Sequence, residues 1–548
     1  MKKLALVLAL ALLLTAALPV EVMAAKEEVL ASGKIGKLNW SVTEDPDTAD
    51  VTLTVSGKGD MPDLTFYDPL LQAGGWCCEP PWALYFPTNV IVKKGVTGIG
   101  AGFLWGTAGM SVESVSLPEG LTRIGDYAFF GCHELEKLRI PKSVKTIGCG
   151  ALTTVSGVTI DDNPWFQITD GLLLTKDGKR LLCAAAGSER CVVPEGVESI
   201  DAHAFAGVPF DITVSIPASV SEIGTGALGN VAALTLDEAN SSFRFVDGAL
   251  LSRDGKRLLA VFSEEETFAV PEGVETVEDY AFYQICARSL SIPASVREIA
   301  PGAWNMMEVE LERIDVAESN PYLCSVDGVL FTRDRRTLLY YPMGRKSMPE
   351  DVQDEDDFAF YEIPEGVEVI GDRAFAWCEM LEVSLPSTLR SVGAWAFFNG
   401  GFDRIGGALV LPEGVEELGV GAFCECDPDV VVVPEGIKDL PAMAFAFLYD
   451  TDEIYLPKSL KSIHADALLG SQDIFWEGGI HYAGSKAQWN KISGHEAVEA
   501  MIDDLYHVVF SSVYSGDDYD YDDYDDYDDY DDDYDYDDYD DDDDYDDE

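Results

Sequence analysis

LPEGLTRIGDYAF, from Leu117 to Phe129, is the stretch that decides the fold, because near-copies of it return at intervals of 22 or 23 residues over most of the chain. A degenerate copy, with Lys93 in place of the proline, precedes the first clear one. Units this short cannot bury their own apolar face, so a fixed period predicts a solenoid whose neighbouring units share one core. The eleven clear copies carry their prolines at Pro118, Pro141, Pro194, Pro217, Pro271, Pro293, Pro364, Pro386, Pro412, Pro434 and Pro457.

The residues before the proline have the pattern of a half-buried strand. Val115 and Leu117 are expected to point inward, whereas Ser114 and Ser116 point outward. Proline has no backbone N–H and a fixed φ, so it does not suit a central position in a sheet. We therefore expect Pro118 to mark the corner where the chain leaves the sheet.

The second half of the unit supplies two further apolar pairs. Leu121 and Ile124 form a second inward pair, and Ala128 with Phe129 form a third corner, for which we expect a short helical turn. The order IP or LP, then Val or Leu, then IG, then AF resembles the BspA-type leucine-rich repeat, and several units add a Cys followed by Leu, as at Cys132. The resemblance covers roughly residues 90–470. It implies a β-rich solenoid and a role in adhesion or in binding proteins or glycans at bacterial surfaces.

A second element recurs between repeat pairs, in the stretch Asp170–Leu182 and in two later copies that begin at Asp247 and Asp327. Asp177 and Gly178 are a strong signal for a tight turn between apolar runs, so each insert is expected to be a β-hairpin. The third copy replaces the glycine of this turn with arginine. The solenoid is thus placed at 91–470, with hairpin inserts near 160–190, 237–265 and 318–345.

The two ends of the chain differ from the repeats. Residues 1–25 read as a secretory signal peptide, with a basic start, an apolar run and a small-residue cleavage site. Residues 26–90 are predicted to form a β-rich cap, with a separate binding module as the alternative. Residues 471–513, around Trp489, are predicted to form a C-terminal cap, with a carbohydrate-binding role for their aromatic residues as the alternative.

The last segment, residues 514–548, is an acidic tail. From Asp517 onward it contains 22 Asp, 9 Tyr and one Glu, a composition that predicts disorder. One interpretation is a solvating extension; another is weak binding of a basic surface or of Ca²⁺ by Asp517, Asp518, Asp520 and the rest of the tail. An EF-hand is not indicated, since its glycine and terminal glutamate are missing.

Charge and motifs exclude several functions. With 37 basic and 99 acidic side chains the chain has no surplus positive charge for phosphates, which argues against nucleic-acid binding. No second apolar run is long enough to span a membrane. None of the six histidines lies in a metal or catalytic motif, so neither cofactor, metal site nor enzymatic activity is predicted.

The eleven cysteines are an odd number, which leaves at least one thiol unpaired in an exported chain. Cys132, Cys378 and Cys426 share one register after the repeat phenylalanine and are predicted to be buried thiols. Cys183 and Cys191 are close enough in sequence to form a disulfide that closes a loop within one insert, and this pairing is an alternative to two free thiols.

The leucine-rich architecture suggests a ligand surface on the outward strand positions. With about 4.7 Å per strand, eleven coils give a sheet on the order of 50 Å long. We therefore expect a secreted or cell-surface protein that binds an extracellular protein or glycan; a cell-envelope scaffold is the alternative, and a glycan-active enzyme a remote one. The candidate positions are Lys137, Arg139, Thr213, Ser215, Ser289, Ser291, Glu382, Ser384, Val430, Val432, Glu453 and Tyr455.

Overall fold

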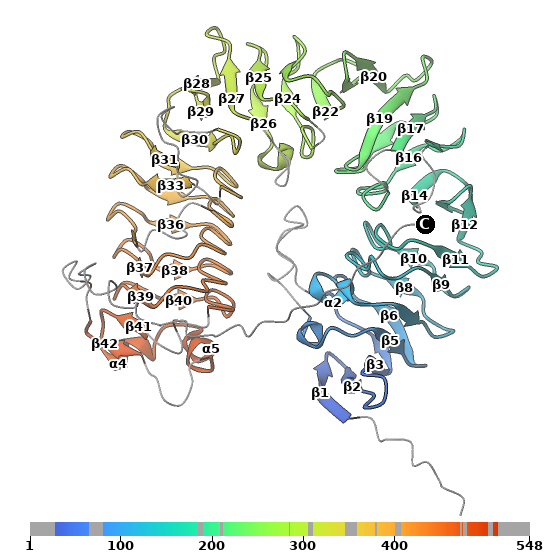
Figure 1. The fold of residues 1–548 in the computed structure, drawn as a ribbon, viewed down its shortest axis with the longest axis horizontal. Helices are drawn as coiled ribbons and strands as arrows, with labels where there is room; N and C mark the ends of the chain where they lie inside the picture. Colours follow the sequence, from blue (N-terminus) through green and yellow to red (C-terminus); the bar gives the residue numbers. More distant parts are fainter. Residues whose placement is uncertain are drawn as a thin grey trace, which may run out of the picture.

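The computed structural model shows a stack of short β-coils that bends into an open arc from the N-terminal to the C-terminal end (Figure 1). It describes residues 28–64, 80–184, 190–208, 212–283, 285–304, 311–345, 359–378, 381–400, 407–471, 474, 479–501, 508–512 and 514. The expected signal peptide and nearly all of the acidic tail lie outside these residues. The predicted β-solenoid is confirmed.

Each coil contributes one strand, here called a front strand, which in most coils lies just before the repeat proline. Front strands pair in parallel within groups of two to four neighbouring coils, and their apolar positions alternate with polar ones. They are β5 (Asn89–Val92), β7 (Ser114–Ser116), β9 (Leu138–Ile140), β11 (Val158–Ile160), β15 (Arg190–Val192), β17 (Ile212–Ile216), β19 (Val231–Leu236), β23 (Thr267–Ala269), β25 (Ser289–Ile292), β27 (Arg313–Val316), β31 (Ala359–Glu362), β33 (Leu381–Ser384), β35 (Ala408–Val410), β37 (Val430–Val432), β39 (Glu453–Leu456) and β41 (Gly479–Tyr482).

After the proline the chain turns and forms a second, shorter strand, here called a side strand. The turn is closed by a hydrogen bond such as that from the Leu121 backbone N–H to the Pro118 carbonyl, 3.1 Å, which confirms the proline as the corner. The side strands are β4 (Gly59–Asp60), β6 (Val96–Ile99), β8 (Arg123–Ile124), β10 (Thr146–Ile147), β16 (Ser199–Ile200), β18 (Glu222–Ile223), β24 (Thr276–Val277), β26 (Glu298–Ile299), β32 (Val369–Ile370), β34 (Ser391–Val392), β36 (Glu417–Leu418), β38 (Asp439–Leu440) and β40 (Ser462–Ile463).

In most coils the third corner is a turn rather than the expected short helical turn; in the coil of Pro293 it is the 3-10 helix η2 (Pro301–Ala303). In the coil of Pro118, Tyr127 takes a positive φ of 52° at this corner, and the backbone N–H of Phe129 donates to the Ala151 carbonyl of the next coil, 3.0 Å. The corner residues therefore bond between coils. A helical turn would direct these N–H groups back into its own coil, which explains the difference.

The three inserts are three-stranded antiparallel sheets, one strand more than a simple hairpin. Their second turn contains Asp177 and Gly178, as expected. Their first turn, which the sequence analysis does not predict, is a two-residue loop at Asp170 and Gly171, whose φ angles are 49° and 79°. The insert strands are β12 (Phe166–Thr169), β13 (Leu172–Thr175) and β14 (Arg180–Ala184); β20 (Phe243–Val246), β21 (Ala249–Ser252) and β22 (Arg257–Val261); and β28 (Leu323–Val326), β29 (Val329–Thr332) and β30 (Thr337–Tyr340).

A buried asparagine begins each insert. In the first, Asn163 is 1% exposed, and its Nδ2 donates to the carbonyls of Pro141 and Val144 at 3.3 and 2.9 Å. Its Oδ1 accepts from the backbone N–H groups of the two insert residues Trp165 and Phe166. One side chain thus joins the corner of the preceding coil to the start of the insert. Asn240 and Asn320 repeat the same four bonds in the other inserts.

The ends of the stack carry different elements. The meander β1 (Glu28–Ile35), β2 (Leu38–Glu44) and β3 (Val51–Gly57) is antiparallel and joins the front strands by parallel pairing of β3 with β5. The other short elements are η1 (Ala83–Tyr85), α2 (Thr107–Met110), η2 (Pro301–Ala303), α4 (Lys486–Trp489), α5 (His495–Glu499) and β42 (Val509–Phe510).

Within the described residues, the core consists of five clusters of buried apolar side chains, each built from successive coils. In the C-terminal half, the rings of Phe375, Phe397, Phe423 and Phe445 stack nearly parallel, with centroids 5.0, 5.2 and 5.6 Å apart. All four are 0% exposed. This phenylalanine stack links four neighbouring coils.

A second column, in the N-terminal half, alternates rings with glycine. The rings of Tyr127, His203 and Tyr280 meet edge to face at 5.5 and 5.3 Å, although Gly150 and Gly226 occupy the same position in the intervening coils. A Cβ on Gly226 would lie 2.7 Å from the His203 ring and 3.1 Å from that of Tyr280. The glycines therefore leave the space that the rings of the neighbouring coils fill.

His203 makes the stability of this column depend on pH. The ring is 3% exposed, and burial lowers its pKa from 6.5 to about 4. The folded state therefore favours the neutral ring, so its contribution is complete above pH 6.5 and is lost as the pH falls toward 4. A shift of this size corresponds to a total of about 3 kcal/mol, of which about 2 kcal/mol is lost by pH 4.5.

The measurement is denaturant unfolding at pH 7.5 and pH 4.5 for the wild type and for His203→Tyr, which installs the residue found at the equivalent positions of Tyr127 and Tyr280. Both chains lose stability from their carboxylates, and the wild type is expected to lose about 2 kcal/mol more. Equal losses in the two chains would show that His203 is not buried in its neutral form.

Candidate interaction surface

The outward positions of the front strands form the surface that the sequence indicated. In β17, Ile212, Val214 and Ile216 are buried, whereas Thr213 and Ser215 are half-buried on the opposite face. Parallel pairing repeats this arrangement from coil to coil, so outward residues stand in rows across the strands. The repeat therefore fixes the shape of this surface. Its chemistry depends on the outward residues, which do not pack in the core.

Most of the predicted positions are accessible. Lys137, Arg139 and Ser291 are exposed. The side chain of Glu382 lies outside the described residues. The half-buried positions are Thr213, Ser215, Ser289, Ser384, Val432, Glu453 and Tyr455.

Val430 departs from this expectation, because it is only 1% exposed. It is the first residue of β37, which lies between the paired strands β35 and β39. The buried side chain is not available to a ligand. Alternation places it on the outward face, but alternation alone does not report what covers that face.

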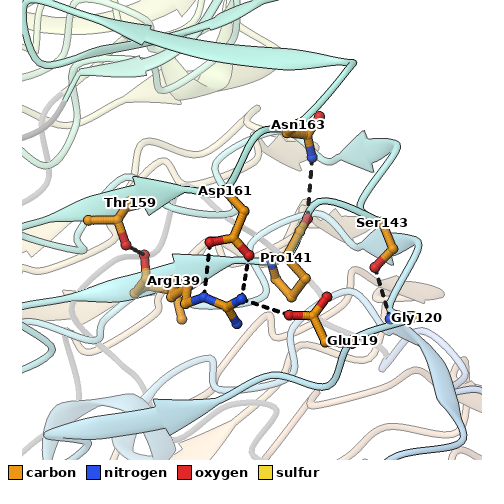
Figure 2. Close-up of polar contacts among 9 residues, drawn as sticks. Glu119, Gly120, Arg139, Pro141, Ser143, Thr159, Asp161 and Asn163 are labelled. Carbon is orange, nitrogen blue, oxygen red and sulfur yellow. Dashed lines mark hydrogen bonds and ion pairs between the residues drawn. The ribbon is translucent and has the colours of Figure 1, made fainter.

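Arg139, near the N-terminal end of the surface, is held by two acidic residues from the adjacent coils (Figure 2). Its Nη2 donates to Glu119 Oε1 at 2.7 Å, and its Nε donates to Asp161 Oδ1 at 3.1 Å. The hydrogen bond to Glu119, followed by the attraction of Asp161, raises the pKa of Arg139. A ligand that used this guanidinium would have to compete with both carboxylates.

At the C-terminal end, the surface carries a cluster of aromatic and polar side chains, of which the sequence predicts only Glu453 and Tyr455. Tyr455 stacks on His481 at 4.4 Å with an interplanar angle of 13°, and the ring of Tyr514 meets Tyr455 edge to face at 5.4 Å. Glu453 Oε2 accepts from the Tyr455 hydroxyl at 2.9 Å, and His481 Nε2 lies 3.3 Å from Glu453 Oε1. Ser512 Oγ lies 3.0 Å from His481 Nδ1.

His481 could have been assigned to this surface. It is in β41, which continues the parallel sheet beyond the last proline-containing coil and pairs it with Tyr455. The strand GIHY alternates as the repeats do, and only its position after the last proline obscured it. Trp489, by contrast, is fully buried, and its Nε1 donates to Glu499 at 3.0 Å, which favours packing over the carbohydrate-binding alternative.

The described part of the chain contains no group of three His, Cys, Asp or Glu side chains arranged to hold a metal ion. Nor does any helix within the described residues have the length and apolarity needed to cross a bilayer. Cys132, Cys378 and Cys426 are buried thiols, as predicted. Cys183 and Cys191 are both free, so the disulfide alternative is not realised; burial raises their pKa to about 12 and about 11.

Comparison with protein families places the repeats in a known class. The family described as the BspA type leucine rich repeat region matches in six copies, at residues 89–163, 182–252, 259–325 and 350–474. These segments cover more than half of the chain. No curated protein sequence matches the chain significantly.

Several solved structures are similar at low identity. A leucine-rich repeat protein from Eubacterium ventriosum shares 15% identity over 82% of this chain and 84% of its own, with a TM-score of 0.33. The pneumococcal vaccine antigen PcpA shares 17% identity over 89% of this chain and 100% of its own, with a TM-score of 0.34. A leucine-rich cell surface protein from Faecalibacterium prausnitzii shares 18% identity over 85% of this chain and 98% of its own, with a TM-score of 0.25.

Proposed function

Because the chain belongs to the BspA-type leucine-rich repeat family, we propose that it is a secreted or cell-surface protein that binds host or microbial surface macromolecules through its front strands. The observation that carries the proposal is the row of outward side chains repeated from coil to coil. The core requires only the inward positions, so the outward ones are free to vary with a ligand. Binding without catalysis is the activity this surface supports.

The chemistry of the surface indicates where contacts would be strongest. The middle coils present small polar side chains such as Thr213 and Ser291, which permit close approach of a flat partner. The end near β41 presents the stacked pair Tyr455 and His481 beside Glu453. Aromatic side chains are enriched among residues that dominate binding energy, so this end is the proposed anchor.

The first experiment measures binding of residues 26–548 to arrays of extracellular-matrix proteins, mucins and glycans. For each array member that binds, we expect Tyr455→Ala to weaken binding about tenfold or more, and Ser291→Arg to weaken it by steric obstruction. The matched control is Ser221→Arg, an exposed serine beside the side strand β18. If the two arginine substitutions weakened binding equally, the front strands would not be the binding surface, and the proposal would be wrong.

A further inference from the structure

Two matching grooves lie where the first and third inserts meet the solenoid. The first has a volume of about 410 Å³ and is lined by Lys145, Trp165 and Lys176 among others. The second has a volume of about 680 Å³ and is lined at the equivalent positions by Arg297, Tyr322 and Arg333. Both also contain the proline that precedes the aromatic residue. Both grooves therefore contain an aromatic ring and two basic side chains at equivalent positions, together with the aspartate that follows the second basic residue, Asp177 in the first groove and Asp334 in the second. Glu298 also lines the second groove.

The ring in each groove is held outward by the buried asparagine that begins the insert. Asn163 Oδ1 accepts from the backbone N–H of Trp165 at 2.7 Å, and Asn320 Oδ1 accepts from that of Tyr322 at 2.8 Å. The residue after each ring is buried in the core, so the ring itself points to solvent. Trp165 is 51% exposed and Tyr322 is 45% exposed. Such exposure of a tryptophan on a fixed backbone has no use in the core.

The basic side chains of the grooves are largely unneutralised, in a chain with a net charge of −62. Within the described residues, Lys145, Lys176 and Arg333 form no ion pair. Arg297 lies 5.7 Å above the Tyr322 ring and pairs with Glu275 at 3.4 Å. Each groove thus offers positive charge beside an accessible ring, which suits a ligand that carries carboxylates and aromatic rings together.

The middle insert shows that the fold does not require this arrangement. Ser242 takes the place of the ring, and Ser221 the place of Lys145. Arg253, the counterpart of Lys176, donates to the backbone carbonyls of Asn240 and Phe243 at 3.2 and 3.5 Å. Its backbone is the same as in the other inserts, with the same asparagine bonds. Among the three inserts, the ring and the basic residue at the position of Ser221 are thus present only in the first and the third.

We propose that the occupant of the two grooves is the Asp/Tyr segment of the same molecule, residues 517–548. That segment consists of carboxylates interleaved with tyrosine rings and has 23 acidic and 9 aromatic side chains. Its carboxylates pair with the basic side chains, and its tyrosines stack on Trp165 and Tyr322. The repeated DDY pattern offers many equivalent registers, so either groove can take any part of it.

The segment is long enough to reach both sites. Tyr322 lies about six coils before the C-terminal end of the stack, roughly 30 Å at about 4.8 Å per coil, and Trp165 about thirteen coils, roughly 60 Å. Thirty-two residues span up to roughly 100 Å when extended. A tethered segment also has an effective concentration near millimolar, so weak contacts at each groove suffice for occupancy within one molecule.

The test titrates a fluorescein-labelled synthetic peptide of residues 517–548 with the chain 26–516, followed by fluorescence anisotropy. We expect binding that weakens at least tenfold between about 50 mM and about 500 mM NaCl, because the pairing is charge-dependent. The chain 26–548 should bind the same peptide at least about tenfold more weakly, because its own segment competes. Equal binding by both chains would overturn occupancy within one molecule.

Variants separate the grooves from general charge attraction. Trp165→Ser with Tyr322→Ser copies the middle insert and should lower peptide affinity at least about tenfold, whereas Val410→Ser, an exposed apolar residue elsewhere, should not. Circular dichroism and unfolding midpoints check that the variants remain folded. Conversely, Ser242→Tyr with Ser221→Arg should strengthen binding by building a third groove. Unchanged affinity in the double serine variant would overturn the proposal.

Two peptide controls test the chemistry. A peptide with every tyrosine replaced by serine keeps the charge, and one with every aspartate replaced by asparagine keeps the rings. Both should bind at least about fivefold more weakly than the natural sequence, since rings and carboxylates each contribute. If the tyrosine-free peptide bound as well as the natural one, the interaction would be that of a polyanion, and the stacking on Trp165 and Tyr322 would be refuted.

Discussion

Replacing Asn240 with alanine is expected to lower the free energy of unfolding by about 3–4 kcal/mol. The substitution removes four hydrogen bonds in a site that is 1% exposed, and two backbone N–H groups and the Val220 carbonyl lose the partner that Asn240 gave them. The Pro217 carbonyl keeps only the 3.4 Å hydrogen bond from the Val220 backbone N–H. Each buried polar group left unsatisfied costs about 1–3 kcal/mol, and partial relaxation of the insert reduces the sum. The effect should be concentrated in the middle insert and the coil of Pro217, which the asparagine joins.

The measurement is guanidinium unfolding combined with amide hydrogen exchange, which resolves the insert from the rest of the stack. Asn240→Asp is a second variant with nearly the same shape. It is expected to be at least as destabilising, because its carboxylate cannot donate to the Pro217 and Val220 carbonyls. Ser242→Ala, in the same insert, serves as the control and should change stability by less than about 0.5 kcal/mol. A loss no larger than that of the control would mean that the asparagine bonds are not essential.

Replacing Phe397 with alanine is expected to cost about 3–5 kcal/mol. The ring is 0% exposed and stacks on Phe375 at 5.0 Å and on Phe423 at 5.2 Å. Its removal therefore opens a cavity between the coil before it and the coil after it. In a repeat protein, stability is approximately the sum of each repeat and its interfaces with its neighbours. Two interfaces are weakened at once, and the stack is expected to break at this coil.

The prediction is tested by denaturant unfolding followed by two probes, one on each side of the coil. Phe397→Leu should cost less than Phe397→Ala, because leucine fills most of the space. Val410→Ala, at a position that is 49% exposed, is the control. The prediction would be contradicted if both probes in Phe397→Ala reported the same unfolding transition and its denaturant midpoint equalled that of Val410→Ala.

Features set by local rules were predictable from sequence. The repeat period indicated the solenoid, and the lack of an N–H in Pro118 located the corner that the structure shows. Asp177 and Gly178 identified one turn of the first insert. These residues act through backbone conformation or through a period counted along the chain, so a single sequence reports them directly.

Features that depend on contacts between coils were not predictable. In the sequence, Asn163 is indistinguishable from an ordinary loop residue. Its role is visible only in the structure, where its side chain donates to carbonyl groups of the preceding coil. Val430 lies at an outward register position but is only 1% exposed, which the alternation along its own strand does not indicate. Trp165 and Lys145 are 20 residues apart in sequence and share a groove only because the insert folds back onto the coil. Such pairs carry no periodic signal.

The alternation of rings and glycine between Tyr127 and Tyr280 has a consequence for how such a chain can change in length. A gene duplication that added a single coil would place two rings, or two glycines, in adjacent coils. Two adjacent rings would clash and two adjacent glycines would leave a void, so either arrangement would destabilise the longer protein. Duplication of a whole unit of two coils with its insert restores the alternation. The spacing of Tyr127, His203 and Tyr280, 76 and 77 residues, matches this larger unit. The heritable unit of this part of the chain is therefore the pair of coils with its insert, rather than the 22- or 23-residue repeat.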